Sequence, residues 1–349
     1  MRRGYLKFRR RAAGLLGIVF LISGILKLWD PVGTMLIVTE YFKFLHVPGL
    51  IPAAKGLGIA LSVTECAVGI GLITGVLRKA SAIVAYVMLG GFTLLTLAIW
   101  IWDAPMDCGC FGQAVHLTHA QSFWKNVILL VLAVIAFTPF KEFGRAKAHR
   151  GVAAVMAMLA IIAAAIYSNT HLPIVDFTPF NWGSQLFASL EEDATEKEFR
   201  KAPILSFRDA DGEYLDEAAA EGKVLVFSVY DPATTDWQTL EQHYRTAFMT
   251  EAQPFLLVAG TEEDIQLPQD IQPCFADYKT LITLNRSNGG GTYFYYGELI
   301  HKWDQRHFPE DLVADVAGDP DVLATRHVTR RRITAQGFCV GLIAILMLF

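Results

Sequence analysis

The sequence has few charged residues and no excess of basic ones. Only 18% of its 349 residues are charged, 53% are hydrophobic, and the mean hydropathy is +0.36. This composition is too apolar for an ordinary soluble domain and predicts an integral membrane protein in contact with lipid. The formal net charge of -4 gives no basic surface for nucleic acid, so we expect no nucleic-acid partner.

Cysteine is also scarce. The five cysteines are too few and too scattered for a disulfide-stapled small domain, and their spacing fits no paired zinc motif, so we predict no metal centre of that kind. They are Cys66, Cys108, Cys110, Cys274 and Cys339. Only Cys108 and Cys110 stand close together, and cysteine chemistry must therefore be local.

Long apolar runs are abundant in the first half of the chain. Five of them are about as long as a helix that crosses a bilayer. They cover residues 11–28, 57–76, 80–102, 123–140 and 152–167. No small-residue cleavage site follows Leu28, so we expect a retained first helix rather than a removed signal peptide.

Basic residues predict the orientation of these spans. They cluster before the first span, at Arg78 and Lys79 after the second, and at Lys141, Arg145, Lys147 and Arg150 after the fourth. All three clusters fall on one side, which the positive-inside tendency assigns to the cytoplasm of the cell (inner) membrane. The loops around 30–52 and 103–122 are then exocytoplasmic.

Three regions follow from this topology. Residues 1–170 form the membrane helical domain, and 171–330 form a folded exocytoplasmic domain. Residues 331–349 form a last apolar helix, which either spans the membrane or lies along its interface. Arg326 and Arg330 to Arg332 precede this helix on the outer side, against the charge bias, but long translocated domains weaken that bias.

The outer domain has a recognisable order of elements. Short β-rich runs at 223–229 and 255–258 alternate with helical segments at 238–250 and 276–284, and a hairpin follows at 292–303. Over about residues 200–320 this order resembles an α/β thioredoxin-like domain. The turn at 230–236, which carries CxxC in redox-active members, has no cysteine here, and residues 287–292 replace the family's cis-proline. We expect a domain without its own dithiol, and a merely buried Cys274.

The membrane half contains one specific motif, Asp107-Cys-Gly-Cys-Phe-Gly112. Together with Gly24, Lys27, Asp30-Pro31 and Glu65, it resembles the DoxX-like proteins and, within them, the methylamine-utilisation MauE family. The resemblance covers about residues 10–140. It implies a four-helix membrane core, extended here by a fifth span, and a role in maturing exported proteins by handling disulfides.

Cys108 and Cys110 are the candidate catalytic residues. Disulfides persist on the exocytoplasmic side, and a bridge across one glycine closes a strained, easily reduced ring. Gly109 and Gly112 allow the backbone angles of a tight loop. Asp107 favours a raised thiol pKa, whereas His116 or a helix N-terminus favours a lowered one, and the sequence leaves the sign open.

Other interpretations of the pair stay open. The cysteines form a fixed structural disulfide, or they are inert thiols, or they bind copper(I) if His116 and His119 fold back toward them. Cys66 and Cys339 lie in apolar helices and are assigned no chemistry.

Glu65 lies mid-span and is a functional candidate because an intramembrane carboxylate is costly to ionise. Lys27 is its expected partner and could help to enclose a small cavity for a quinone or a proton path. The alternative is that Lys27 snorkels to the surface while Glu65 bonds a neighbouring helix as a neutral acid.

The sequence therefore predicts a membrane protein of the MauE/DoxX type that supports exocytoplasmic thiol-disulfide exchange with an exported or periplasmic protein partner. Cys108 and Cys110 would exchange, supported by Asp107, Gly109, Gly112, Glu65 and Lys27. The rival hypothesis is a non-enzymatic scaffold whose CxC loop is structural. No cofactor is required by the residues, although a quinone or a copper ion stays open as a ligand.

Overall fold

A computed structural model describes residues 2–138, 148–191, 193–260 and 271–348. The chain divides into two compact units. One comprises residues 1–175 together with 335–349, and the other comprises residues 176–334. Each unit has its own core, and they are described separately here.

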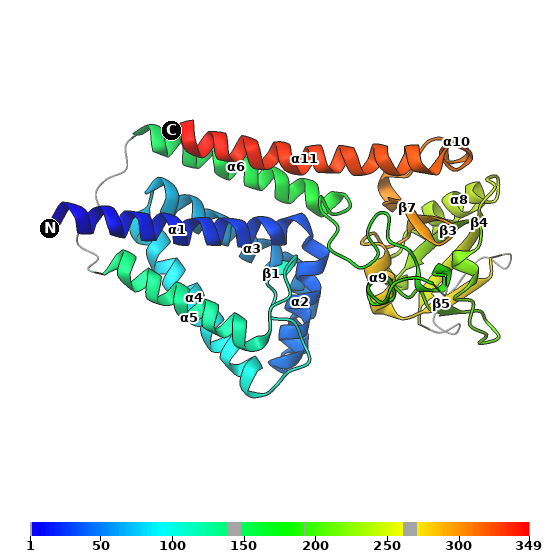
Figure 1. Ribbon diagram of the computed structural model, residues 1–349, viewed down its shortest axis with the longest axis horizontal. Helices are drawn as coiled ribbons and strands as arrows, with labels where there is room; N and C mark the ends of the chain where they lie inside the picture. The colour runs from blue at the N-terminus through cyan, green and yellow to red at the C-terminus, as the bar shows by residue number, and fades with distance from the viewer. Residues whose placement is uncertain (1, 139–147, 192, 261–270, 349) are drawn as a thin grey trace. The chain divides into compact units, whose positions relative to one another are not determined.

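The first unit is an all-helical bundle (Figure 1). Its elements are α1 (Arg2–Trp29), α2 (Pro31–Phe44), a 3-10 turn η1 (Pro48–Ala53), α3 (Ala54–Thr74), α4 (Arg78–Ile101), the extended segment β1 (Cys110–Gln113), α5 (His119–Phe137) and α6 (Ala148–Thr170). In the described residues, five helices are long and apolar enough to cross a membrane; α1, α3 with η1, α4, α5 and α6 provide them. The expectation of five apolar helices of membrane-spanning length is confirmed.

The first membrane loop contains a helix that the sequence analysis did not anticipate. Asp30 begins α2 as its N-cap, since its carboxylate accepts a hydrogen bond from the Gly33 amide at 2.8 Å, and Pro31 occupies the first turn, where its missing N–H costs nothing. The Thr34 hydroxyl donates to the Lys27 carbonyl at 2.9 Å and thus joins the start of α2 to the end of α1. The Asp30-Pro31 motif therefore sets the angle between two helices.

The fourth span begins earlier than its apolar run. Thr118 caps α5 in a capping box with Gln121, so the helix starts at His119 rather than Phe123. At the other end, the predicted span limit at Phe140 and the basic residues Lys141, Arg145 and Lys147 lie outside the described residues.

Glycines allow α1 and α3 to pack closely. A Cβ on Gly69 of α3 would lie 2.7 Å from the Gly17 carbonyl oxygen of α1, and a Cβ on Gly24 would lie 2.6 Å from the Ser62 carbonyl oxygen. Small residues permit this approach of two backbones inside a membrane. The contact places the C-terminal end of α1, with Lys27, beside the middle of α3, with Glu65.

The second unit is built on a six-stranded mixed sheet. Its strands are β2 (Phe207–Arg208), β3 (Lys223–Val229), β4 (Gln253–Ala259), β5 (Pro273–Ala276), β6 (Gly290–Tyr295) and β7 (Glu298–Trp303), in the order β2-β5-β4-β3-β6-β7. β3 pairs parallel with β4 and antiparallel with β6, and β4 pairs parallel with β5. The expected strand-helix-strand-helix-hairpin order is present, with β5 as an additional short strand.

Helices cover both faces of this sheet. α8 (Trp237–Ala247) and α10 (Leu312–Ala317) lie on one face, and α9 (Tyr278–Leu284) lies on the other. The unit also contains the short helix α7 (Glu196–Phe199) and 3-10 turns at Phe187–Ser189, Ala218–Ala220, Pro232–Thr234 and Gln305–His307. Leu225 and Phe227 pack with residues of α8 and α10, whereas Val224 and Val226 face α9. This alternation follows from the two-residue period of a strand and gives the unit two apolar cores.

The turn after β3 has no cysteine and is tied by an asparagine instead. The Tyr230 and Asp231 amides donate to Asn288 Oδ1 at 2.9 and 3.0 Å, and Asn288 Nδ2 donates to the Asp231 carbonyl and to Thr235 Oγ1, both at 2.8 Å. Cys274 is buried in the core behind α9, and burial raises its pKa to about 11. Neither feature supports dithiol chemistry in this unit.

The last helix, α11 (Pro320–Leu348), starts before the final apolar stretch. It is not among the five helices that meet the criteria for a membrane span. Within the first unit, Leu342 packs in one cluster with Cys66 of α3 and Ile161 of α6.

Candidate functional site

The two cysteines lie in the loop between α4 and α5, where β1 passes beside α1 and α2. Gly109 (φ 62°) and Gly112 (φ 61°) both adopt the left-handed conformation that favours glycine. A Cβ on Gly109 would lie 2.3 Å from Ile37 Cγ2 of α2, so only glycine lets the loop approach that helix. Both glycines of the motif thus set the conformation of the loop, and Gly109 also lets it pack against α2.

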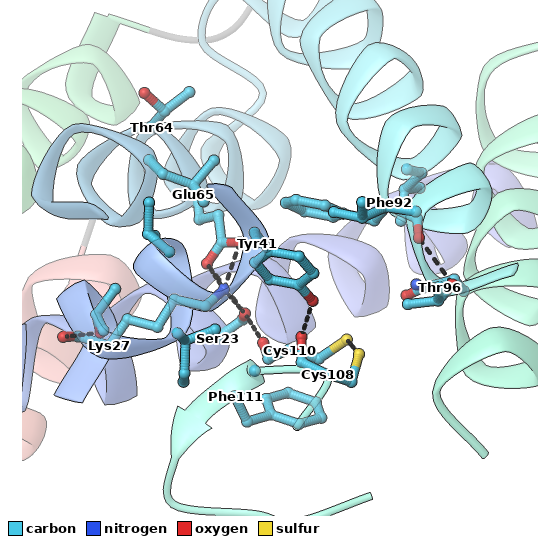
Figure 2. Close-up of a pocket in the computed structure, with 18 of the residues that line it drawn as sticks. Ser23, Lys27, Tyr41, Thr64, Glu65, Phe92, Thr96, Cys108, Cys110 and Phe111 are labelled. Carbon is cyan, nitrogen blue, oxygen red and sulfur yellow. Dashed lines mark hydrogen bonds and ion pairs between the residues drawn. The ribbon is translucent and has the colours of Figure 1, made fainter. Parts of the chain in front are cut away.

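Cys108 and Cys110 face one another (Figure 2). Their Sγ atoms are 2.7 Å apart, and both residues are thiols in the structure. Cys108 is buried, whereas Cys110 is only partly buried. Cys110 is therefore the more accessible of the two to a second molecule.

The two thiols differ in acidity. A hydrogen bond from Cys108, helped by the positive charge of Lys125, lowers the pKa of Cys110 to about 6 although burial opposes this. The same bond, together with burial, raises the pKa of Cys108 far above its usual range. The arrangement therefore favours a Cys110 thiolate that accepts a hydrogen bond from a protonated Cys108.

Lys27 and Glu65 form a buried ion pair, as their positions in the sequence led us to expect. Lys27 Nζ lies 2.6 and 2.8 Å from the two carboxylate oxygens of Glu65, and the side chains are only 6% and 1% exposed. Lys27 thus does not snorkel to the surface. Such a pair has to satisfy its remaining hydrogen bonds locally, because no water replaces them inside a membrane.

Ser23 connects this ion pair to the cysteine loop. Its Oγ accepts a hydrogen bond from Lys27 Nζ at 3.0 Å and lies 3.0 Å from Glu65 Oε2. It also lies 2.7 Å from the carbonyl oxygen of Cys110, to which it can donate. The intramembrane pair and the cysteine loop therefore belong to one polar network.

A second contact comes from α2. The Tyr41 hydroxyl donates to the carbonyl oxygen of Cys108. Burial, and then the electrostatic influence of the neighbouring cysteines, raise the pKa of Tyr41, so the phenol stays protonated as a donor. Both cysteine carbonyls are thus held by hydroxyl groups from the helical bundle.

The cysteines open onto a cavity of about 490 Å³. Its walls come from α1 to α5 and are mainly apolar; they include Phe20, Leu61, Phe92, Leu95 and Leu129. The polar lining includes Lys27, Glu65, Tyr41 and Asn126. In Figure 2, Cys108, Cys110, Tyr41 and Lys27 gather around one part of it.

Asp107 and His116 lie apart from the thiols. They form an exposed pair, with 3.0 Å between Asp107 Oδ2 and His116 Nδ1, while His119 Nε2 approaches the Met106 carbonyl oxygen at 3.0 Å. Instead, Cys108 and then Lys125 lower the pKa of Cys110. Neither histidine folds onto the sulfur atoms, and no group of three or more His, Cys, Asp or Glu side chains gathers as metal ligands in the described part of the chain.

Sequence reasoning missed three residues of this site: Ser23, Tyr41 and Lys125. Ser23 stands four residues before Lys27, on the same helix face, and this spacing could have indicated it. Lys125 is a lone cation in the first two turns of an apolar span, which is itself a signal for a partner. Tyr41 offered no signal, because α2 was taken for a loop.

Comparison with known proteins agrees with this description of the membrane half. Residues 7–139 match the family model described as methylamine utilisation protein MauE. Over these residues the chain is similar to the MauE family. The match ends where α5 ends, so it contains the cysteine loop, the ion pair and the cavity. No curated protein and no solved structure matches the chain.

Proposed function

We propose that this MauE-type membrane protein carries out thiol-disulfide exchange at Cys108 and Cys110. The observation that carries the proposal is the meeting of the two sulfur atoms, 2.7 Å apart, at a site where only Cys110 is partly accessible. One thiol is thus presented for attack while the other lies behind it. This is the arrangement that a two-step exchange requires.

The chemistry proceeds through a mixed disulfide. The Cys110 thiolate attacks one sulfur of a partner's disulfide, the partner's S–S bond breaks, and its other sulfur leaves as a thiolate that takes up a proton. Cys108 then loses its proton and attacks the Cys110 sulfur, which releases the partner's second thiolate and forms a Cys108–Cys110 disulfide. In the reverse direction the same steps oxidise a partner dithiol.

The charge distribution supports an exocytoplasmic position for this loop. Arg10, Arg78 and Arg150 come close enough to interact electrostatically, so basic residues of α1, α4 and α6 gather at one end of the bundle. The cysteine loop follows the opposite end of α4. With the basic end in the cytoplasm, the cysteines face the oxidising side, where disulfide chemistry operates.

In this proposal the second unit binds the exported protein partner and does no redox chemistry of its own. The succession of β3, α8, β4, α9 and the β6–β7 hairpin supports a thioredoxin-like interpretation, and the turn tied by Asn288 stands where a dithiol would be.

Trapping the mixed disulfide tests the exchange. In Cys108→Ala the resolving thiol is absent, so incubation with oxidised glutathione should leave a glutathione adduct on Cys110, detectable by mass spectrometry of the intact protein. Cys110→Ala should give no adduct, and Cys339→Ala, in α11, serves as the matched control that behaves like the wild type. If Cys108→Ala forms no adduct, the scaffold hypothesis with a structural CxC loop replaces exchange.

A further inference from the structure

The cavity beside the cysteines has the size of a ligand site. Its volume of about 490 Å³ lies within the range of roughly 300–1,000 Å³ that is usual for small-molecule pockets. Apolar side chains from five helices form most of the wall, and both cysteines belong to it. A largely apolar molecule of drug size would therefore lie against the sulfur atoms.

The cavity also reaches a surface that faces lipid. Leu45 and Leu57 belong to its wall and are 51% and 46% exposed. Thr64, which directly precedes Glu65 on α3, also belongs to the wall and is exposed. Leu57 and Thr64 lie on a membrane-spanning helix, so their exposed sides contact the bilayer. A ligand can thus enter from the lipid phase, which favours a lipid-soluble occupant over a water-soluble ion or peptide.

Hydrogen-bond donors define the polar part of the ligand. The Tyr41 hydroxyl and the Lys27 ammonium belong to the cavity wall, but their protons are already donated to the Cys108 carbonyl and to Glu65 and Ser23. The Asn126 amide, also in the wall, is the donor that a ligand meets. Asn126 Nδ2 lies 3.3 Å from Thr96 Oγ1, and an amide carries a second N–H beyond that contact. An amide N–H on an otherwise apolar wall matches a ligand that carries a carbonyl oxygen on an apolar body.

We propose that the cavity binds a lipid-soluble quinone, which accepts the electron pair of the Cys108–Cys110 dithiol. This inference rests on the proposed thiol-disulfide exchange. The quinone would be the electron acceptor that regenerates the Cys108–Cys110 disulfide after each oxidised partner leaves.

The electrons and protons of this step balance. The Cys110 thiolate adds to a ring carbon of the quinone, and Cys108 then attacks the Cys110 sulfur. The S–S bond forms, the C–S bond breaks, and its electron pair stays on the ring. One quinone oxygen takes the proton of the Cys108 thiol, and the other takes a proton from water that replaces the one Cys110 released on becoming a thiolate, so one dithiol and one quinone give one disulfide and one quinol. In this proposal Lys27, which belongs to the cavity wall, stabilises negative charge on a quinone oxygen before protonation.

The test uses the full chain, reduced and free of oxygen, in lipid nanodiscs, with decyl-ubiquinone as the probe. We expect quinone absorbance to fall by one equivalent per protein while two thiols disappear. The double variant Cys108→Ala/Cys110→Ala should reduce none. If the wild type exchanges with oxidised glutathione but reduces no quinone, the quinone proposal is wrong and the exchange stands. If the wild type does not exchange, the proposed function fails first.

A matched pair of tryptophan variants on α3 locates the site. Ala60 belongs to the cavity wall, whereas Ala67, two turns further along and also exposed, does not. Ala60→Trp should slow quinone reduction by about tenfold or more because the indole fills space that the ligand needs, while glutathione exchange stays at the wild-type rate. Ala67→Trp should leave both rates unchanged. Equal rates of quinone reduction in the two variants would contradict the cavity as the quinone site. So would a phospholipid that stays bound in native mass spectra when excess quinone is added.

Discussion

At the scale of single residues, the character of the cysteine pair depends on side chains that are distant in the sequence. Lys125 of α5 supplies the charge that favours a Cys110 thiolate, and Tyr41 and Ser23 hold the carbonyl groups of the loop. The motif itself contributes the two sulfur atoms and the glycines that bring them together. The low pKa of Cys110 comes first from Cys108 within the motif and then from Lys125 of α5.

A pH profile of alkylation tests this asymmetry. Because the pKa of Cys110 is lowered to about 6, its thiolate persists at neutral pH and is lost only as the pH falls through that value. Iodoacetamide should therefore modify Cys110 with a midpoint near pH 6, while Cys108 stays unmodified across the neutral range. Peptide mass spectrometry after short exposures at each pH measures both.

Removal of the hydrogen-bond donor provides the control for that profile. Cys108→Ala abolishes the largest cause of the shift, so the midpoint of Cys110 should move upward toward the ordinary thiol value. A wild-type midpoint already at that ordinary value would contradict the proposed thiolate.

The Lys27–Glu65 pair gives a stability prediction. Removal of one partner leaves an uncompensated charge in a buried site, so Lys27→Met or Glu65→Leu alone should lower the free energy of unfolding by about 3–5 kcal/mol. The double variant should regain much of this loss, since no charge is then left unpaired. Thermal unfolding of the purified variants in one detergent measures all three. Additive losses in the double variant would show that the two side chains do not interact.

At the scale of elements, the α1–α3 contact depends on missing side chains. Gly69→Ala places a Cβ 2.7 Å from the Gly17 carbonyl oxygen, where backbone has to move, and should cost about 1–3 kcal/mol. Gly14→Ala on α1 is the control, because no atom lies within 4 Å of its Cβ, and it should be neutral or slightly stabilising. Melting temperatures distinguish them, and equal shifts would refute close packing at Gly69.

The turn after β3 is stabilised chiefly through Asn288. Asn288→Ala removes four hydrogen bonds to Tyr230, Asp231 and Thr235, so the turn should loosen and the unit should lose about 2 kcal/mol or more. Hydrogen exchange should show lost protection of the Tyr230 and Asp231 amides. Asn181→Ala, which removes a single side-chain bond to the Thr178 carbonyl, should leave that turn protected. Unchanged exchange in Asn288→Ala would contradict this role.

These elements also show what a sequence can and cannot predict. The five apolar helices and β3 followed from run length and β-branched composition, because those signals are local. The α2 helix was missed because, at 14 residues, it is too short for a membrane span; the cap at Asp30 and Pro31 in the first turn were the local signals for its start. The Lys27–Glu65 pair could be inferred from the cost of intramembrane charge, whereas the contacts of Lys125 and Tyr41 with the cysteine loop depend on how the helices pack.

At the scale of the whole molecule, the proposed topology separates two exposed positions. In a Cys110→Ser background, Asp211→Cys in the second unit should react with a membrane-impermeant maleimide on intact cells. Lys79→Cys, in the first turn of α4, should react only after the membrane is opened. Both positions are exposed, so burial does not confuse the result as it would at Cys274. The reverse pattern of labelling would indicate the inverted topology, with the cysteine pair in the cytoplasm.

Ser23 has a single hydroxyl proton but two acceptors, Glu65 Oε2 at 3.0 Å and the Cys110 carbonyl oxygen at 2.7 Å. It can satisfy only one of them at a time. When the proton points to the carboxylate, the loop carbonyl loses its donor, and when it points to the loop, Glu65 relies on Lys27 alone. The hydroxyl therefore acts as a two-position rotor, and its orientation makes the rigidity of the cysteine loop depend on the ionisation of a carboxylate in the middle of the membrane.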